Sequence, residues 1–134
     1  MIREALRAVV LANPAASAAL GGTRIYPLQM PQGVRDPSLV YQRVGGSPDE
    51  TLDGPVALRE TRWQFDAWAK DPDQAAALMA VVEPVLNGFT GQVAVGPLTC
   101  NIKGMFLDNE ADGYDPAAKL YRERRDFVVF WCPA

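Results

Sequence analysis

Residues 57–69 alternate between mainly apolar and polar side chains, and this alternation constrains the fold more than any other feature of the sequence. One set of alternate positions is Thr61, Trp63, Phe65 and Ala67, and the set between them is Arg62, Gln64 and Asp66. Side chains two positions apart share one face of a β-strand, so the pattern predicts a strand with one buried face. We expect Trp63 and Phe65 to lie on a sheet face that helices cover.

The first twelve residues have the spacing of an amphipathic helix that could provide this cover. Their apolar side chains recur at helical spacing, and Arg3, Glu4 and Arg7 lie on the opposite side. This charged pattern differs from the apolar core of a signal peptide, and no apolar run approaches the roughly 20 residues that cross a bilayer. We therefore expect a helix on the sheet, then a short helical turn capped by Asn13, and no membrane insertion.

A second long helix is predicted between Asp71 and Asn87. Asp71 can accept the free amide hydrogens at its start, and Pro72 suits the first helical position because that residue needs no N–H donor. Pro84 should kink the last turn, and the Asn87-Gly88 pair should end the helix.

The remaining predicted elements are strands at 24–26, 38–44, 92–95, 98–107 and 120–132. A polar loop from Asp108 to Lys119 should join the last two strands into a long hairpin, with Gly113 supplying a positive φ. Hairpins without regular βαβ crossovers predict an α+β fold, in which a single mainly antiparallel sheet has the two longer helices packed on one face. We expect one domain over residues 1–134.

The composition argues against catalysis and against binding to nucleic acid. The chain has no histidine, the commonest general base and metal ligand. Cys100 and Cys132 fall in apolar strand-like segments, so we predict two reduced core thiols without a base to activate them. The formal charge of −3 disfavours binding to phosphates. We expect no enzyme activity, no catalytic residue and no cofactor.

The acidic segment that begins at Asp108 resembles the start of a calcium-binding loop. Lys119 stands where that loop needs a bidentate carboxylate, and strands are predicted where helices should flank it. We therefore predict no metal site.

Seven short segments, spread over nearly the whole chain, carry a family resemblance. They are 1–7 (MIREALR), 23–27 (TRIYP), 39–43 (LVYQR), 51–55 (TLDGP), 63–68 (WQFDAW), 104–108 (GMFLD) and 120–122 (LYR). In this order and at this chain length they resemble the tail-completion (tail-terminator) protein family of siphophages, prophages and gene transfer agents. The family offers no active-site residues to carry over.

The resemblance implies a subunit that forms a hexameric ring on the last ring of tail tube protein, stops polymerisation and presents a surface to the head. The implied partners are further copies of the chain, tail tube protein and a head-neck stopper or connector, while DNA passes through the lumen. Synthesis would take place in the bacterial host cytoplasm, and the final location would be the tail-neck junction of the virion. The alternatives are a head-side neck protein, such as a stopper or adaptor, and a small cysteine hydrolase.

A closed ring requires one edge of each subunit to complement a different edge of the next, and opposite charge patches can supply this. The predicted subunit-interface residues are Asp108, Glu110, Asp112 and Asp115 on one side, and Arg122, Arg124 and Arg125 on the other. Arg122 and Arg124 should share a strand face. Local ion pairing within the hairpin is the competing interpretation, and the projecting segment from Gly45 to Pro55 is a second candidate contact surface.

Overall fold

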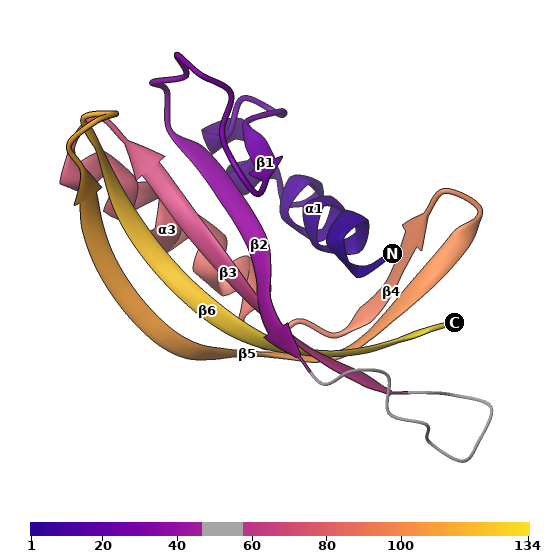
Figure 1. The fold of residues 1–134 in the computed structure, drawn as a ribbon. Helices are drawn as coiled ribbons and strands as arrows, with labels where there is room; N and C mark the ends of the chain where they lie inside the picture. The colour runs from indigo at the N-terminus through magenta and orange to yellow at the C-terminus, as the bar shows by residue number, and fades with distance from the viewer. Residues whose placement is uncertain (47–57) are drawn as a thin grey trace.

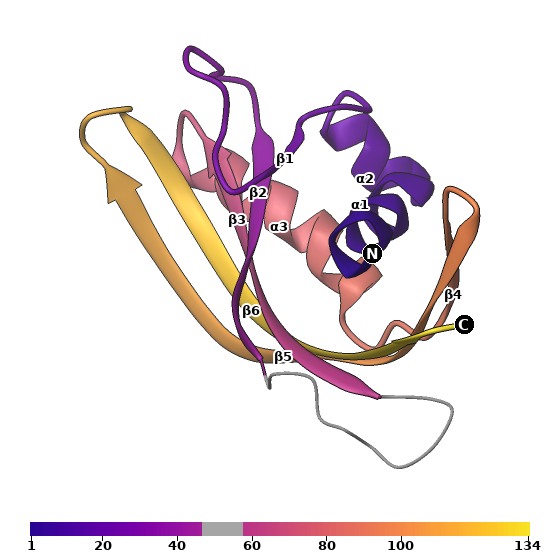
Figure 2. The same cartoon turned by 45° about the vertical axis from the view of Figure 1, so that its right-hand side comes forward.

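The computed structural model describes residues 1–46 and 58–134, and in this part of the chain a six-stranded sheet carries three helices on one face (Figures 1 and 2). The helices are α1 (Ile2–Ala12), α2 (Pro14–Ala19) and α3 (Pro72–Leu86). The strands are β1 (Ile25–Pro27), β2 (Ser38–Gly46), β3 (Arg59–Ala69), β4 (Gly91–Val95), β5 (Leu98–Asp115) and β6 (Leu120–Pro133). Most of the predicted projecting segment from Gly45 to Pro55 lies outside the described residues.

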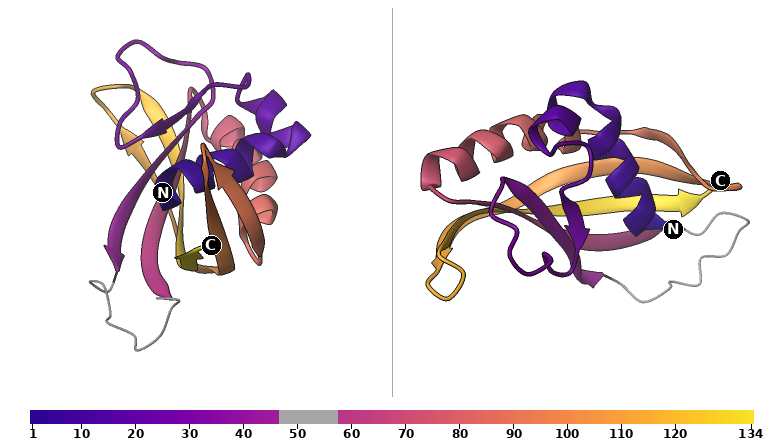
Figure 3. Two further views of the ribbon diagram at one scale, coloured as in Figure 1. Left: turned by 90° about the vertical axis from the view of Figure 1, so that its right-hand side faces the viewer. Right: turned by 90° about the horizontal axis from the view of Figure 1, so that it is seen from above.

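The strands lie in the order β1-β2-β3-β6-β5-β4. The β1–β2 pair is parallel, and the other four neighbouring pairs are antiparallel. The sheet curves around α1 and α3, which lie on its concave face (Figure 1), and two further views show the helices on the same side (Figure 3). The α+β prediction of a mainly antiparallel sheet with two longer helices on one face is confirmed.

The core fills the space between this concave face and the helices. Trp63 and Phe65 of β3 are 4% and 0% exposed, as the alternation predicts. Tyr41 of β2 stacks on Phe65 with ring centroids 5.5 Å apart, and Phe127 of β6 meets Phe65 edge-on at 5.8 Å. The hydroxyl of Tyr41 donates a hydrogen bond to the carbonyl oxygen of Arg3 at 2.9 Å, which ties the start of α1 to the sheet.

The helix starts follow the local signals in the sequence. Asn13 Oδ1 accepts from the amide of Ala16 at 3.0 Å, and Asp71 Oδ1 accepts from the amide of Gln74 at 2.8 Å. Pro14 and Pro72 begin their helices directly after these caps. Each cap satisfies an amide that the first turn of a helix leaves without a partner.

The predicted loop from Asp108 to Lys119 is wrong, because β5 continues as a strand to Asp115 and β6 begins at Leu120. The extra length pairs residue by residue with β6, so the partner strand fixes a segment whose composition is typical of a loop. The positive φ falls on Lys119 rather than on Gly113. Glycine at 113 has another role, since a Cβ atom there would lie 2.6 Å from the guanidinium of Arg122.

Both cysteines are buried and free, as predicted from their apolar surroundings. Burial is the main cause that raises the pKa of the Cys100 thiol, and the nearby Cys132 raises it further. A raised pKa lowers the fraction of thiolate, the reactive form of cysteine.

We predict that neither thiol reacts with Ellman's reagent in the folded protein and that both react once guanidinium unfolds it. The reason is that burial excludes the reagent and disfavours the thiolate of Cys100. Absorbance of the released thionitrobenzoate measures the reaction. The Cys100→Ser and Cys132→Ser variants, if folded, should still assemble into particles. A thiol that reacts rapidly in the native protein would instead favour the hydrolase alternative.

Candidate assembly surface

The seven predicted interface residues lie on the two strands of the long β5–β6 hairpin, but on different faces of it. In the register with β3, Arg124 is opposite Asp66 and Arg122 is opposite Trp68, so both arginines point to the open face, away from the helices. Arg125 is opposite the buried Phe65 and therefore points to the helix side. The prediction that Arg122 and Arg124 share a face is confirmed.

Arg124 forms a two-pronged ion pair with Asp66 of β3 on the open face. Its Nε atom donates to Asp66 Oδ1 at 2.8 Å, and its Nη2 atom donates to Oδ2 at 3.1 Å. These hydrogen bonds are the largest cause of the raised pKa of Arg124. The planar guanidinium matches both oxygens of a carboxylate, which makes this kind of pair strong and directional.

Arg125 lies among three carboxylates on the helix side. Its Nε atom is 2.7 Å from Glu83 Oε1 of α3 and 3.6 Å from Glu110 Oε1 of β5, and its Nη1 atom donates to Glu123 Oε2 at 3.0 Å. Burial works to lower the pKa of Arg125, but the hydrogen bonds to Glu83 and Glu123 outweigh it and leave the pKa raised. Because one cation faces three anions, this group of side chains has a net negative charge.

Three more of the predicted interface residues, Arg122, Asp108 and Asp115, also make contacts within the chain. The guanidinium of Arg122 lies over the ring of Trp68, 5.9 Å from its centroid. Asp108 forms an ion pair with Arg62, and Asp115 Oδ1 accepts from the amide of Ala117 at 3.0 Å in the hairpin turn.

Arg124 pairs outside the hairpin, with Asp66 of β3, whereas Arg125 pairs both with Glu83 of α3 and, within the hairpin, with Glu123 and Glu110. The role of these arginines between subunits stays a prediction. The partners Asp66, Glu83 and Trp68 come from other elements of the fold and were not predicted from the sequence. The position of Asp66 could have been predicted, because the alternation of residues 61–67 places Arg62, Gln64 and Asp66 together on the face away from the helices. Glu110 and Asp112 remain largely exposed and are the most available carboxylates of the predicted set.

A partly exposed aromatic pair lies on the same open face as Arg62 and Arg124. Phe106 is 54% exposed, and its ring meets Phe130 edge-on with centroids 6.1 Å apart. A Cβ atom at Gly104 would lie 2.8 Å from the Phe106 ring, so glycine makes room for it.

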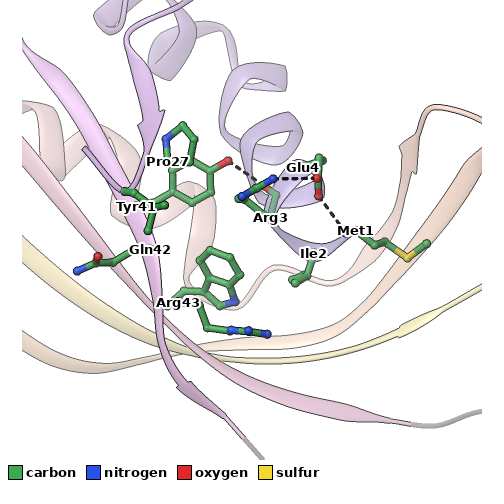
Figure 4. Close-up of a pocket in the computed structure, with 10 residues that line it drawn as sticks. Met1, Ile2, Arg3, Glu4, Pro27, Tyr41, Gln42 and Arg43 are labelled. Atoms are coloured by element: carbon green, nitrogen blue, oxygen red, sulfur yellow. Dashed lines mark hydrogen bonds and ion pairs between the residues drawn. The ribbon is translucent and has the colours of Figure 1, made fainter. Parts of the chain in front are cut away.

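A pocket of about 370 Å³ lies at the opposite edge of the sheet, between the start of α1 and strands β1 and β2 (Figure 4). Arg3 and Arg43 border it, and Glu4 Oε2 lies 3.0 Å from the amino group of Met1. The hydrogen bond to this amino group is the main cause that lowers the pKa of Glu4. The lining combines the cationic Arg3 and Arg43 and the acidic Glu4 with apolar side chains.

Within residues 1–46 and 58–134, no three His, Cys, Asp or Glu side chains are grouped so that they could hold a metal ion. No helix in the same ranges is long and apolar enough to cross a membrane.

Comparison with known proteins identifies the fold and the family. A chain from a structure titled "Virion of native gene transfer agent (GTA) particle" superposes with a TM-score of 0.68, at 16% identity, over 96% of this chain and 92% of that chain. No curated protein matches the sequence. The family model described as "Tail completion protein gp17" matches residues 4–130. This match covers nearly the whole chain, which therefore belongs to the tail completion protein gp17 family.

Proposed function

We propose that this chain, acting as one domain, is the subunit of the ring that ends the tail tube of a phage-type particle. The match to the tail completion family carries this proposal, because it includes the described helices and strands in whole or in large part. The similar fold in a gene transfer agent virion supports a structural role in a particle of that kind. In this role the chain carries out no reaction and needs no cofactor.

The ring would have a different partner on each of its sides. One side would contact the last ring of tail tube protein and stop polymerisation, and the other would receive the head-neck stopper or connector at the tail-neck junction. DNA would pass through the lumen. The open sheet face supports such contacts, because Phe106 and Phe130 place apolar surface beside the ion pairs of Arg62 and Arg124.

The purified chain should form rings of six copies, alone or on tube protein, because a cap on a rotationally symmetric tube must match the symmetry of that tube. Native mass spectrometry gives the copy number, and negative-stain images show the ring. Adding the chain to polymerising tube protein should shorten the tubes. A chain that stays monomeric when mixed with tube protein would contradict the proposal.

The head-side neck protein remains the second candidate, and the same preparation tests it. Purified chain is mixed separately with tail tube protein and with portal complex. The terminator role predicts binding to tube ends, whereas the stopper or adaptor role predicts binding to the portal complex alone.

A further inference from the structure

Strand β5 has a long outer edge that no described strand pairs with. Strand β4 covers it only from Leu98 to Ile102. Beyond Ile102, residues at the end of α3 form hydrogen bonds with this edge in place of a strand. Gly88 N donates to Met105 O at 2.7 Å, and Leu107 N donates to Asn87 Oδ1 at 3.1 Å. From 109 to 114 the outer edge is open within the described ranges.

Strand β2 has an open outer edge at the other side of the sheet. The short β1 covers it from Leu39 to Tyr41, and Leu28 N donates to Tyr41 O at 2.9 Å. From Gln42 to Gly46, none of the described strands lies outside β2. Unpaired N–H and C=O groups along such an edge form a template for another strand.

At the outer edges of β2 and β5, some residues point their N–H and C=O groups away from the rest of the sheet. The side chains of these residues lie on the face that the helices cover. Tyr41 points its carbonyl outward, so Arg43, two residues later, points the same way. On β5, the residues with outward groups are Met105 and Leu107 before the bulge at 107/109. After the bulge, Glu110 and Asp112 continue on the helix side, opposite Arg125 and Glu123.

The open parts of β2 and β5 can pair with each other between two copies of the chain. Three antiparallel pairings separate β2 from β5, so these strands run in opposite directions in the sheet. A second copy placed beside the first with its helices on the same side would therefore pair its β2 with β5 as antiparallel strands. The open part of β5 lies toward the hairpin turn and the open part of β2 lies at the other end of the sheet, so an offset along the strands brings them together.

The charges on the two edges are opposite. Glu110 has a side chain that is 60% exposed, and it lies in the negatively charged group around Arg125, with the exposed Asp112 following on the same face. Arg43 is exposed on the other edge, and Arg3 at the start of α1 borders the same pocket as Arg43. Opposite charges that face each other across neighbouring strands stabilise the pairing and fix its partner.

We infer that β5 residues 109–114 of one copy pair with β2 residues 42–46 of the next, with Glu110 and Asp112 facing Arg43. This joint is head to tail and so builds a ring or an open helical array from one kind of contact. It rests on the proposed ring function and names the surface that closes the ring. The occupant of each open edge is thus a second copy of this chain.

Charge reversal with a mixing step tests the joint. The Glu110→Lys/Asp112→Lys variant and the Arg43→Glu variant should each form at least tenfold fewer rings than the wild type in native mass spectrometry. An equimolar mixture of the two should restore rings that contain both variants, because each reversed edge then meets a partner of opposite charge.

A proline substitution tests the backbone pairing separately from charge. Asp112→Pro removes an outward-pointing N–H group together with the carboxylate, so it is compared with Asp112→Ala, which removes the carboxylate alone. The hairpin should keep its pairing to β6 in both variants, and the proline variant should form far fewer rings than the alanine variant. Circular dichroism and the melting temperature check the fold of each variant. Normal rings from the folded edge variants, or no rescue on mixing, would overturn the joint while leaving the ring itself in place. Failure of the wild type to form rings even with tube protein would instead overturn the proposed function.

Discussion

Replacing Trp63 by alanine is expected to lower the free energy of unfolding by about 3–5 kcal/mol. The side chain is 4% exposed and contacts Tyr41, with ring centroids 5.8 Å apart, so its removal leaves a cavity between the sheet and α1. Its Nε1 atom also donates to Thr61 Oγ1 at 3.0 Å, and that buried hydroxyl would lose a partner. Single domains are stable by only about 5–15 kcal/mol, so little folded protein should remain.

Urea unfolding followed by circular dichroism measures this loss, or the yield of soluble protein shows it if the variant does not fold. Phe106→Ala is the matched control, because it removes an aromatic ring that is 54% exposed on the open face. Its expected cost is about 1 kcal/mol, the value of its edge-on contact with Phe130. Equal losses for the two variants would contradict the assignment of Trp63 to the core.

Local signals in the sequence predict much of this fold. The alternation around Trp63 identifies the central strand, and Asp71 with Pro72 marks the start of α3 within a residue. These signals work because each depends on residues close together in the chain. The extension of β5 to Asp115 could not be predicted in this way, since its polar residues become a strand only through pairing with β6.

The residues of the candidate surface could be predicted from the sequence, but their contacts could not. The sequence identifies Arg124 and Arg125 as a dense group of cations, but their partners Asp66 and Glu83 lie far away in the chain. The open edges of β2 and β5 are also tertiary features. They depend on how far β1 and β4 extend along their neighbours, which no pattern within β2 or β5 specifies.

The ion pair between Asp66 and Arg124 gives the second large expected effect. The Asp66 side chain is 9% exposed and that of Arg124 is 25% exposed, so Asp66→Ala leaves a guanidinium in a mostly buried place without its two hydrogen bonds. Removing one partner of a fully buried pair costs about 3–5 kcal/mol. Partial exposure lets water solvate Arg124, so we expect about 2–3 kcal/mol here.

A double-mutant cycle separates the pair from the packing around it. Asp66→Ala, Arg124→Ala and the double variant are unfolded in urea, and the double variant should lose less stability than the two single losses together. The reason is that the double variant has neither an unpaired guanidinium nor an unpaired carboxylate. Asp66→Asn is the conservative control, because it keeps the shape and one oxygen acceptor, and it should be less destabilised than Asp66→Ala. Additive losses across the cycle would mean that Arg124 and Asp66 contribute to stability independently of each other.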